Sequence, residues 1–329
     1  MTIRPLRLAM VGCGAFSRRY HLPAIEADSG VTLAAIFDPT PADAVRALAA
    51  RHSAVLTADL AAVLAPGVAD MAIVTTPHAL HARHIEAVLD ASLHVLVDKP
   101  FVVASADARR LAEAAAAADL VAAVAFNRRF DESCRRARAL VADGAIGDLA
   151  YVETVQLGWE RAGWFLDPAL NGPGPFMGRL THMADIVPWI TGRRPRRLRC
   201  VVKPALVAGR TDRGGVVDVD LDGLECRFTC LEDGLHMWDE IRLFGADGLV
   251  ELRRPLNLPI GWQLSRRDRA REVETLAADA APGDATRDFF AAIREGGRPT
   301  CTFEDAWLSV RVVEAAYQSA KAGGDWIDV

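Results

Sequence analysis

Over its first 126 residues the chain alternates short apolar runs with segments of helical pattern. Each run is bounded by turn residues or charge, and runs that are apolar on both faces are typical of parallel strands buried between helix layers. The repeated order of strand and helix predicts an α/β domain with a doubly wound parallel sheet, the Rossmann arrangement. The expected strands are 6–11, 33–37, 71–74, 95–97 and 121–126, and the expected helices are 17–27, 41–51, 81–89 and 104–118.

The turn after the first expected strand has the pattern Gly12-x-Gly14-x-x-Ser17. The first glycine permits a tight turn, the second lets a pyrophosphate approach the backbone, and the third position needs only a small side chain. The amides of Ala15 and Phe16, at the start of the next helix, then face the phosphates. The turn predicts a dinucleotide site, and a glycine turn in an unrelated α/β fold is the alternative.

Asp38 follows the second expected strand. A carboxylate at this position binds the ribose hydroxyls of NAD and repels the 2′-phosphate of NADP. We therefore expect NAD rather than NADP as the cofactor, and a helix-capping role for Asp38 is the alternative.

Asp98 and Lys99 follow the strand expected at 95–97. Ligands of an open α/β sheet sit at the carboxyl ends of its strands, so Lys99 is expected near the nicotinamide. Lys99 is one of only three lysines, with Lys203 and Lys321, among 38 basic residues. Lysine can lose its proton whereas arginine cannot, and a buried lysine acts as a general acid or base. The alternative is that Asp98 pairs with an arginine while Lys99 points to water.

From residue 149 onward the pattern changes to strict alternation of apolar and polar residues, which is typical of strands with one solvated face. Asp222-Gly223 is a hairpin signal between two such strands. The second half is therefore predicted to be an α+β domain with a large, open, mostly antiparallel sheet. The alternating segments include 151–157, 217–221 and 224–230, and further turns are expected at 233–234 and 247–248.

The chain is long enough for two hydrophobic cores. We expect an NAD-binding Rossmann domain over residues 1–126, and a domain for substrate binding and oligomerisation over residues 127–329. A C-terminal helix at about 303–322 can pack back on the first domain.

Two motifs in the second half have competing interpretations. Asp218-x-Asp220-x-Asp222-Gly matches the front of a calcium loop, but Thr229 stands where a bidentate glutamate is required, so a solvated strand face is favoured. A run of arginines precedes this segment. It is interpreted as a solvated loop, with an anion site for a nucleotide-sugar phosphate as the alternative. It consists of Arg193, Arg194, Arg196, Arg197 and Arg199.

Two further features concern the substrate. Trp159 and Trp164 flank a loop rich in proline and glycine, which can wall a pocket, although tryptophan is more often core. His182 and Asp185 share one face of a helix expected over 180–190, and a histidine oriented by a carboxylate is a usable general base. A histidine satisfied inside the core is the alternative.

Charge and composition argue against several classes of partner. The net charge of −5 disfavours nucleic acid. No apolar run approaches the roughly 18 residues that span a bilayer, and the first ten residues fit a buried strand better than a signal peptide. The scattered cysteines are typical of a reduced, cytoplasmic chain, and no cluster has metal-ligand spacing. They are Cys13, Cys134, Cys200, Cys226, Cys230 and Cys301.

A series of short motifs, in this order and spacing, resembles the glucose–fructose oxidoreductase/inositol dehydrogenase/rhizopine-catabolism (Gfo/Idh/MocA) family over nearly the whole chain. The motifs are Gly12-Cys13-Gly14, Thr76-Pro77-His78-Ala79-Leu80-His81, Asp98-Lys99-Pro100, Phe126-Asn127-Arg128-Arg129-Phe130, Trp164-Phe165-Leu166-Asp167-Pro168, residues 172–174, and His182-Met183-Ala184-Asp185.

The resemblance implies an NAD-dependent oxidoreductase that moves a hydride between nicotinamide and a hydroxyl or keto carbon of a sugar, aminosugar, nucleotide sugar or cyclitol. It implies that Lys99 sits beside nicotinamide and substrate, with Asp98 in place of the usual Glu, and that His182 is the acid/base. It also implies a homodimer or homotetramer formed through the second-domain sheet. The implied cofactor contacts are Thr76, Pro77, His81, Asp98 and Asn127, and the expected substrate contacts are Arg128, Trp164, His182 and Asp185.

One departure from the family pattern affects the expected chemistry. Many members carry an Asp four residues before the histidine and a Gly two before it, where this chain has Gly178 and Leu180. Asp185 can take over part of the missing role. Two other hypotheses stay open: an enzyme that uses bound NAD transiently for elimination or glycoside cleavage, and a non-catalytic NAD- or sugar-binding regulator, against which Lys99 and His182 speak.

Overall fold

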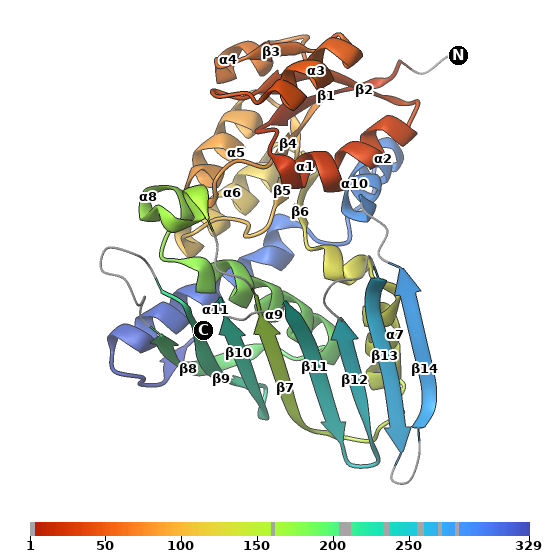
Figure 1. Ribbon diagram of the computed structural model, residues 1–329, viewed down its shortest axis with the longest axis vertical. Coiled ribbons are helices and arrows are strands. Elements are labelled where there is room, and N and C mark those ends of the chain that lie inside the picture. The colour runs from red at the N-terminus through yellow and green to blue at the C-terminus, as the bar shows by residue number, and fades with distance from the viewer. Residues whose placement is uncertain are drawn as a thin grey trace. The chain divides into compact units, whose positions relative to one another are not determined.

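The protein divides into two compact units, described below from a computed structural model (Figure 1). The first unit comprises Met1–Phe126 and Pro282–Trp307, and the second comprises Asn127–Ala281 and Leu308–Val329. The segment 282–307, expected in the second domain, therefore groups with the first. The structure describes residues 4–158, 162–203, 212–232, 237–254, 260–268, 272–279 and 283–329.

The first unit contains a six-stranded parallel sheet in the order β3-β2-β1-β4-β5-β6, as predicted for a doubly wound domain. The chain starts in the middle of the sheet and moves outward to β3. It then crosses to β4, so the strand order reverses between β1 and β4. The strands are β1 (Leu6–Val11), β2 (Val31–Phe37), β3 (Val55–Thr57), β4 (Met71–Val74), β5 (His94–Asp98) and β6 (Ala122–Ala125).

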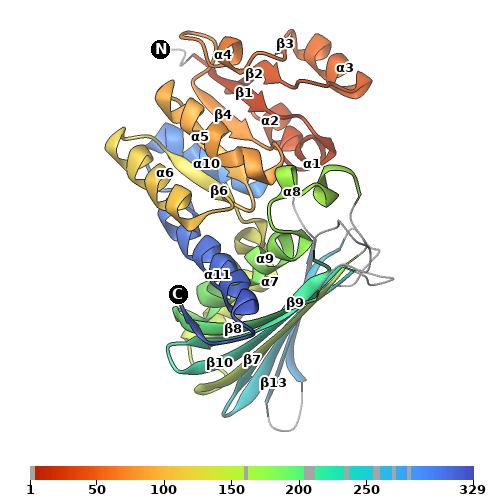
Figure 2. The ribbon, with the colours of Figure 1, turned by 90° about the vertical axis from the view of Figure 1, so that its left-hand side faces the viewer.

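Helices cover both faces of this sheet: α5 and α6 pack together on one face, and α2 and α10 pack together on the other (Figures 1 and 2). The single helix expected over 17–27 is two helices that meet at His21, because Pro23 lies in the first turn of the second and has no N–H to continue the first. The helices are α1 (Ala15–Tyr20), α2 (Leu22–Ala27), α3 (Asp43–His52), α4 (Leu60–Val63), the 3₁₀ turn η1 (His78–Leu80), α5 (His81–Asp90), α6 (Ser105–Ala117) and α10 (Asp284–Glu295).

The second unit contains a nine-stranded sheet in the order β14-β13-β12-β11-β7-β10-β9-β8-β15. Its pairs are antiparallel except β10 and β7, which run parallel, so the predicted, mostly antiparallel sheet is confirmed. The strands are β7 (Leu149–Leu157), β8 (Pro195–Lys203), β9 (Gly214–Leu221), β10 (Leu224–Leu231), β11 (Trp238–Gly245), β12 (Gly248–Arg254), β13 (Ile260–Asp268), β14 (Glu272–Asp279) and β15 (Ile327–Asp328).

The predicted hairpin at Asp222-Gly223 joins β9 to β10, and both residues have positive φ angles, 50° and 85°. Two such residues form the tight turn that suits the twist of antiparallel strands. The expected turn at 247–248 lies between β11 and β12. The turn expected at 233–234 lies outside the described residues.

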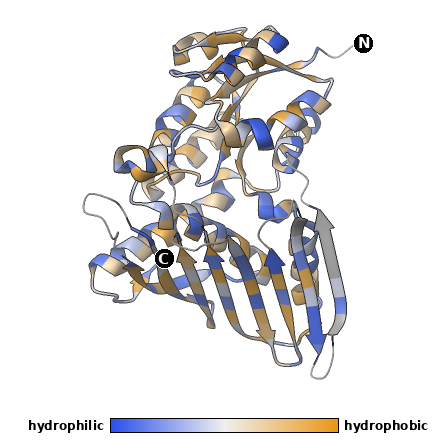
Figure 3. Ribbon diagram, viewed as in Figure 1, coloured by the Kyte–Doolittle hydropathy of each residue, from blue (hydrophilic) through white to orange (hydrophobic). Residues whose placement is uncertain are grey.

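Apolar and polar residues alternate along these strands (Figure 3), so one face of the sheet is part of the core. The residues Val217, Val219, Cys226 and Phe228 of β9 and β10 are buried. Among the helices of this unit, α9 packs on β9 and β10, and α7 on β12 to β14. The helices are the 3₁₀ turn η2 (Asn127–Phe130), α7 (Glu132–Ala142), the 3₁₀ turn η3 (Gly163–Leu166), α8 (Pro168–Asn171), α9 (Pro175–Thr191) and α11 (Phe303–Lys321), which begins in the first unit.

The basic run at 193–199 was expected in a loop, whereas most of it lies in strand β8, beside β9. Arg197 pairs with Asp220 at 3.3 Å, and Arg199 pairs with Asp218 at 3.0 Å. These pairs join the basic run to the aspartates of β9. Asp218 and Asp220 therefore lie on a strand, the interpretation that was favoured over a calcium loop. The described residues contain no group of His, Cys, Asp or Glu that could hold a metal ion.

Candidate functional site

The glycine turn after β1 has the geometry that a dinucleotide requires. Gly12 has a φ of +88°, and a Cβ there would lie 3.0 Å from the backbone of Thr75, whose hydroxyl donates to the Gly12 carbonyl at 2.8 Å. Gly14 precedes α1, and a Cβ on it would meet none of the described atoms within 4 Å. The turn therefore leaves open space in front of the first amides of α1, which fits a pyrophosphate.

The first residues of α1 differ in exposure. Phe16 is 44% exposed and stacks on Tyr20 with 5.4 Å between ring centroids. Ala15 is exposed, whereas Ser17 is buried and donates its hydroxyl to the Gly14 carbonyl at 3.1 Å. The third position of the motif thus needs a small residue, and serine fills it with an internal hydrogen bond.

Asp38 lies directly after β2 and is half-buried. Its amide donates to the Thr57 carbonyl at 3.1 Å, and its Oδ1 accepts from the Thr40 amide at 3.0 Å. These two bonds fix the carboxylate at the carboxyl end of the sheet, where a ribose can be bound.

Thr76, Pro77 and His81 follow β4. Thr76 is 8% exposed, and its Oγ1 lies 2.8 Å from Nδ1 of the buried His84. The His81 ring is 1% exposed and lies between two carbonyl oxygens, that of Thr76 at 2.8 Å and that of Pro100 at 2.9 Å. The ring therefore lies inside the unit and links the turn after β4 to the turn after β5.

Asp98 ends β5, and Lys99 follows in the turn, joined to Pro100 by a cis peptide bond. Burial raises the pKa of the Asp98 carboxyl from its ordinary value of 3.8 to about 6, against the Lys99 ammonium and amide, which lower it. Two titratable groups thus adjoin each other at the carboxyl end of the sheet, where Gly12, Asp38 and Thr76 also lie. The structure brings together most of the predicted cofactor residues of the first unit.

In the second unit, His182 and Asp185 lie on α9, which is longer than the helix expected over 180–190. His182 is half-buried, and Asp185 is buried. Asp185 accepts hydrogen bonds from Arg129 Nε at 3.0 and 3.2 Å and forms an ion pair with the same guanidinium. The carboxylate therefore balances a buried arginine.

Arg128, expected at the substrate, is 6% exposed. Its Nη2 donates to Asp239 at 3.1 Å, its Nη1 to the Met183 sulfur at 3.6 Å, and its guanidinium lies 5.0 Å from the centroid of the Trp262 ring. These contacts fasten η2 to α9 and the sheet. The neighbouring Asn127 is half-buried, and its Oδ1 is buried without a hydrogen-bond partner among the described residues.

Trp164 is half-buried in η3 and stacks on Phe165 with 3.8 Å between ring centroids. Asn171 donates to the Phe165 carbonyl at 2.9 Å, and this bond joins α8 to η3. Trp159 lies outside the described residues.

Two groups that brace the start of α9 were not predicted from the sequence: the half-buried Asp212 and the buried Arg179. Asp212 accepts from the Phe176 amide at 2.9 Å and from the Tyr317 hydroxyl at 2.5 Å, and burial raises the pKa of Asp212 to about 6. Arg179 forms a buried ion pair with Glu232 at 2.5 Å. An arginine within an otherwise apolar helix segment was the available signal for this pair.

Gly158 explains how the Arg179 side chain fits at the end of β7. A Cβ at Gly158 would lie 1.6 Å from Arg179 Nη2, so a larger residue would displace the guanidinium. The first two turns of α9, which carry Gly178 and His182, are therefore held by one carboxylate at the helix start and one buried ion pair.

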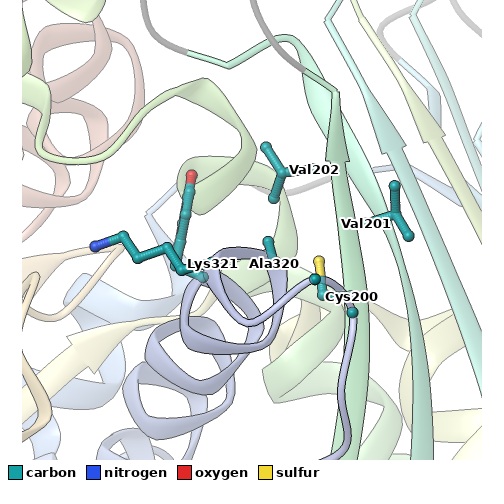
Figure 4. A pocket seen from close by; sticks show the side chains of 8 residues that line it. Cys200, Val201, Val202, Ala320 and Lys321 are labelled. Atoms are coloured by element: carbon teal, nitrogen blue, oxygen red, sulfur yellow. The ribbon is translucent and has the colours of Figure 1, made fainter.

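A separate hollow of about 390 Å³ lies between β8 and the end of α11 in the second unit (Figure 4). It contains none of the predicted site residues. Its lining residues are Cys200, Val201, Val202, Tyr317, Ala320, Lys321, Gly323 and Gly324.

No helix among the described residues is long and apolar enough to cross a membrane.

Comparison with protein families agrees with both units. Residues 6–126 match the oxidoreductase family with an NAD-binding Rossmann fold (GFO_IDH_MocA), and residues 134–251 match the GFO/IDH/MocA C-terminal domain. The chain therefore belongs to the Gfo/Idh/MocA oxidoreductase family.

Two curated relatives indicate the range of the match. The rhizopine catabolism protein MocA of Rhizobium meliloti is 24% identical over 324 residues, which cover 94% of this chain and 93% of that protein. D-glucoside 3-dehydrogenase of Escherichia coli (strain K12) is 29% identical over 200 residues. That match covers 58% of this chain and 56% of that enzyme, so it spans little more than half of its length.

Two solved structures share the fold. GenD2 from gentamicin A biosynthesis, in complex with NAD, has a TM-score of 0.84 and 26% identity, over 100% of this chain and 97% of that chain. KijD10, a 3-ketoreductase from Actinomadura kijaniata in complex with NADP and TDP-benzene, has a TM-score of 0.86 and 19% identity, over 96% of this chain and 98% of that chain. Since these two proteins hold different nicotinamide cofactors, the choice between NAD and NADP depends on this chain's own residues.

Proposed function

We propose that this protein is an NAD-dependent oxidoreductase that transfers a hydride between nicotinamide and a hydroxyl or keto carbon of a sugar or cyclitol. The observation that carries the proposal is the grouping of Gly12, Asp38, Thr76 and Lys99 at the carboxyl end of one parallel sheet. A dinucleotide binds at that end of a doubly wound sheet, where the strand order reverses. D-glucoside 3-dehydrogenase, a partial relative, supports a sugar as the substrate.

Asp38 supports NAD as the cofactor. Its carboxylate is fixed by the Thr40 amide and would lie beside the ribose, where its charge repels a 2′-phosphate. Gly12 and Gly14 would hold the pyrophosphate against the amides of α1. When bound, NAD would supply hydride transfer, and the protein's residues would supply orientation and proton transfer.

The proton chemistry is assigned to Lys99 and His182. His182 would take the proton from the substrate hydroxyl during oxidation and return it during reduction, and Lys99 would polarise the same oxygen. The neighbouring Asp98, whose pKa burial raises to about 6, supports this role as a second group that exchanges a proton close to neutral pH.

Kinetics of the Lys99→Ala variant test this assignment. We expect kcat/KM to fall by roughly 10²- to 10⁴-fold, because a positioned acid–base group contributes about that much. Lys321→Ala is the matched control, since Lys321 is exposed at the end of α11. Unchanged turnover in Lys99→Ala would remove Lys99 from the mechanism.

A second candidate function follows from Gly178, which stands where many family members carry an aspartate. An enzyme of this kind would oxidise its substrate transiently with bound NAD, eliminate or cleave a bond, and then return the hydride. Such an enzyme would purify with NAD bound and would convert sugar without net reduction of added NAD. Product analysis beside nicotinamide absorbance separates the two functions.

A further inference from the structure

The first unit contains a buried histidine next to Thr76, at the carboxyl end of the parallel sheet, and its contacts determine which ring nitrogen is protonated. His84 lies on α5, is 2% exposed, and packs edge-on against Phe37 with 5.6 Å between ring centroids. Its Nδ1 lies 2.8 Å from Thr76 Oγ1, and its Nε2 accepts a hydrogen bond from Arg83 Nε at 3.3 Å. Each ring nitrogen thus has one partner.

The Arg83 contact fixes the tautomer of His84. A guanidinium only donates, so Nε2 must present its lone pair to Arg83. Burial, with smaller contributions from Arg83 and His81, lowers the pKa of His84 to about 4, and the ring is therefore neutral at pH 7. The single ring proton is then on Nδ1, and Nδ1–H donates to the Thr76 hydroxyl oxygen.

This donation orients the Thr76 hydroxyl. Among the residues that the structure describes, His84 is the one hydrogen-bond partner of Thr76 Oγ1, and the hydroxyl uses that bond as an acceptor. Its own proton therefore stays available for a further acceptor. In the reverse arrangement the hydroxyl would donate to Nδ1, and the ring proton would be on Nε2. Two N–H groups, those of Nε2 and of Arg83 Nε, would then face each other with no acceptor between them.

The Thr76 side chain lies against the glycine turn. A Cβ built at Gly12 would lie 3.0 Å from Thr76 Cγ2, so the two residues are in close contact. His81, one helical turn before His84, has its Nε2 2.8 Å from the Thr76 carbonyl. Two histidines of α5 thus hold the main-chain and side-chain oxygens of Thr76 beside the turn that would bind the pyrophosphate.

We propose that His84 is a positioning residue that, as the Nδ1–H tautomer, turns the Thr76 hydroxyl proton toward an acceptor oxygen of the bound dinucleotide. The proposal rests on the proposed NAD site and deepens it. His84 would have no contact with the cofactor and would act through Thr76.

The tautomer can be measured without cofactor. In protein labelled with ¹⁵N-histidine, we expect the His84 ring at pH 7 to have a protonated Nδ1 and a bare Nε2. The signal is assigned by its loss in His84→Asn. A ring protonated on Nε2, or on both nitrogens, would overturn the proposal whether or not the protein binds NAD.

A double-mutant cycle tests the link to the cofactor. Thr76→Val removes the hydroxyl at constant shape, and His84→Leu removes the donor. Each is expected to weaken NAD binding by roughly three- to tenfold, the effect of one lost hydrogen bond. The double variant should bind no more weakly than either single variant, because His84 acts through the hydroxyl. Thr76→Ser and His84→Asn, which keep a hydroxyl and an N–H donor respectively, should retain most of the affinity.

The outcomes separate this proposal from the proposed function. Losses of affinity that simply add, or full NAD affinity in either single variant, would overturn the role of His84 while leaving an NAD-dependent enzyme. A wild-type protein that binds no NAD would overturn the proposed function together with the cofactor contact of Thr76, and the ring tautomer would still be tested by the labelled protein.

Discussion

At the scale of single residues, Gly12 and Gly14 have different reasons to be glycine. Gly12 has a φ of +88° and contacts the Thr75 backbone, whereas Gly14 has an ordinary φ of −68° and open space around its Cβ position. Gly12→Ala should therefore lower the free energy of unfolding by about 1–3 kcal/mol, the cost of a strained backbone position.

Gly14→Ala is the matched control for this prediction. It should change the free energy of unfolding by less than about 0.5 kcal/mol, yet weaken NAD binding, because the methyl group would occupy the space in front of α1. Urea unfolding and NAD titration of both variants provide the measurements. Equal loss of stability in both would contradict the distinction.

The expected cofactor residues depend on local sequence, whereas the surroundings of the expected substrate residues depend on tertiary packing. Gly12 and Asp38 each follow a strand, as the sequence predicts, and their expected roles depend on that place. Asp185 accepts hydrogen bonds from Arg129, 56 residues away along the chain. Arg128 donates to Asp239, 111 residues away. Such partners depend on tertiary packing, and a single sequence does not show them.

At the scale of elements, the start of α9 depends on Asp212. The pKa of this half-buried carboxyl is raised from 3.8 to about 6, so the folded protein holds a proton that the unfolded chain loses at lower pH. The free energy of unfolding should therefore fall as pH rises from about 4 to about 6, by about 1–3 kcal/mol from this group.

Asp212→Asn tests this pH dependence, since asparagine keeps the shape and an acceptor for the Phe176 amide. Denaturant unfolding between pH 4 and pH 7 should show a shallower decline in the variant. Asp98, whose pKa is also raised to about 6, should account for part of the decline that remains. An identical decline in both proteins would show that Asp212 has an ordinary pKa in the fold.

Element boundaries were predictable where a long pattern repeats and less so where single residues decide. β1 and β4 have the predicted bounds, because each is a mostly apolar run ending at a turn. The three-residue β3 has no such run and was missed. The arginines of β8 were interpreted as a loop because the aspartates that pair with them come from the next strand.

At the scale of the whole molecule, the first unit is discontinuous in sequence. Residues from 282 to 307 complete it: Phe303 packs on Phe101 with 4.2 Å between ring centroids, Thr286 bonds His21 at 2.8 Å, and the Cys301 carbonyl accepts from the Val124 amide at 3.0 Å. Fully buried phenylalanines in this segment belong to the same core.

A fragment of residues 1–126 should therefore lack cooperative thermal unfolding, because it exposes the surfaces that α10 and Phe303 cover. Circular dichroism during heating is the measurement. The same fragment joined by a flexible linker to residues 282–307 is the control and should unfold cooperatively. A sharp transition in the shorter fragment would show that the returning segment is dispensable.

The central claim is that this protein transfers hydride between NAD and a sugar or cyclitol. The most direct measurement is nicotinamide absorbance with purified protein, NAD or NADP, and a panel of sugars, cyclitols and their keto forms. We predict turnover with at least one substrate, faster with NAD than with NADP because of Asp38. NAD that binds but is neither reduced nor oxidised with any member of the panel would contradict the claim and favour transient redox chemistry or a regulatory role.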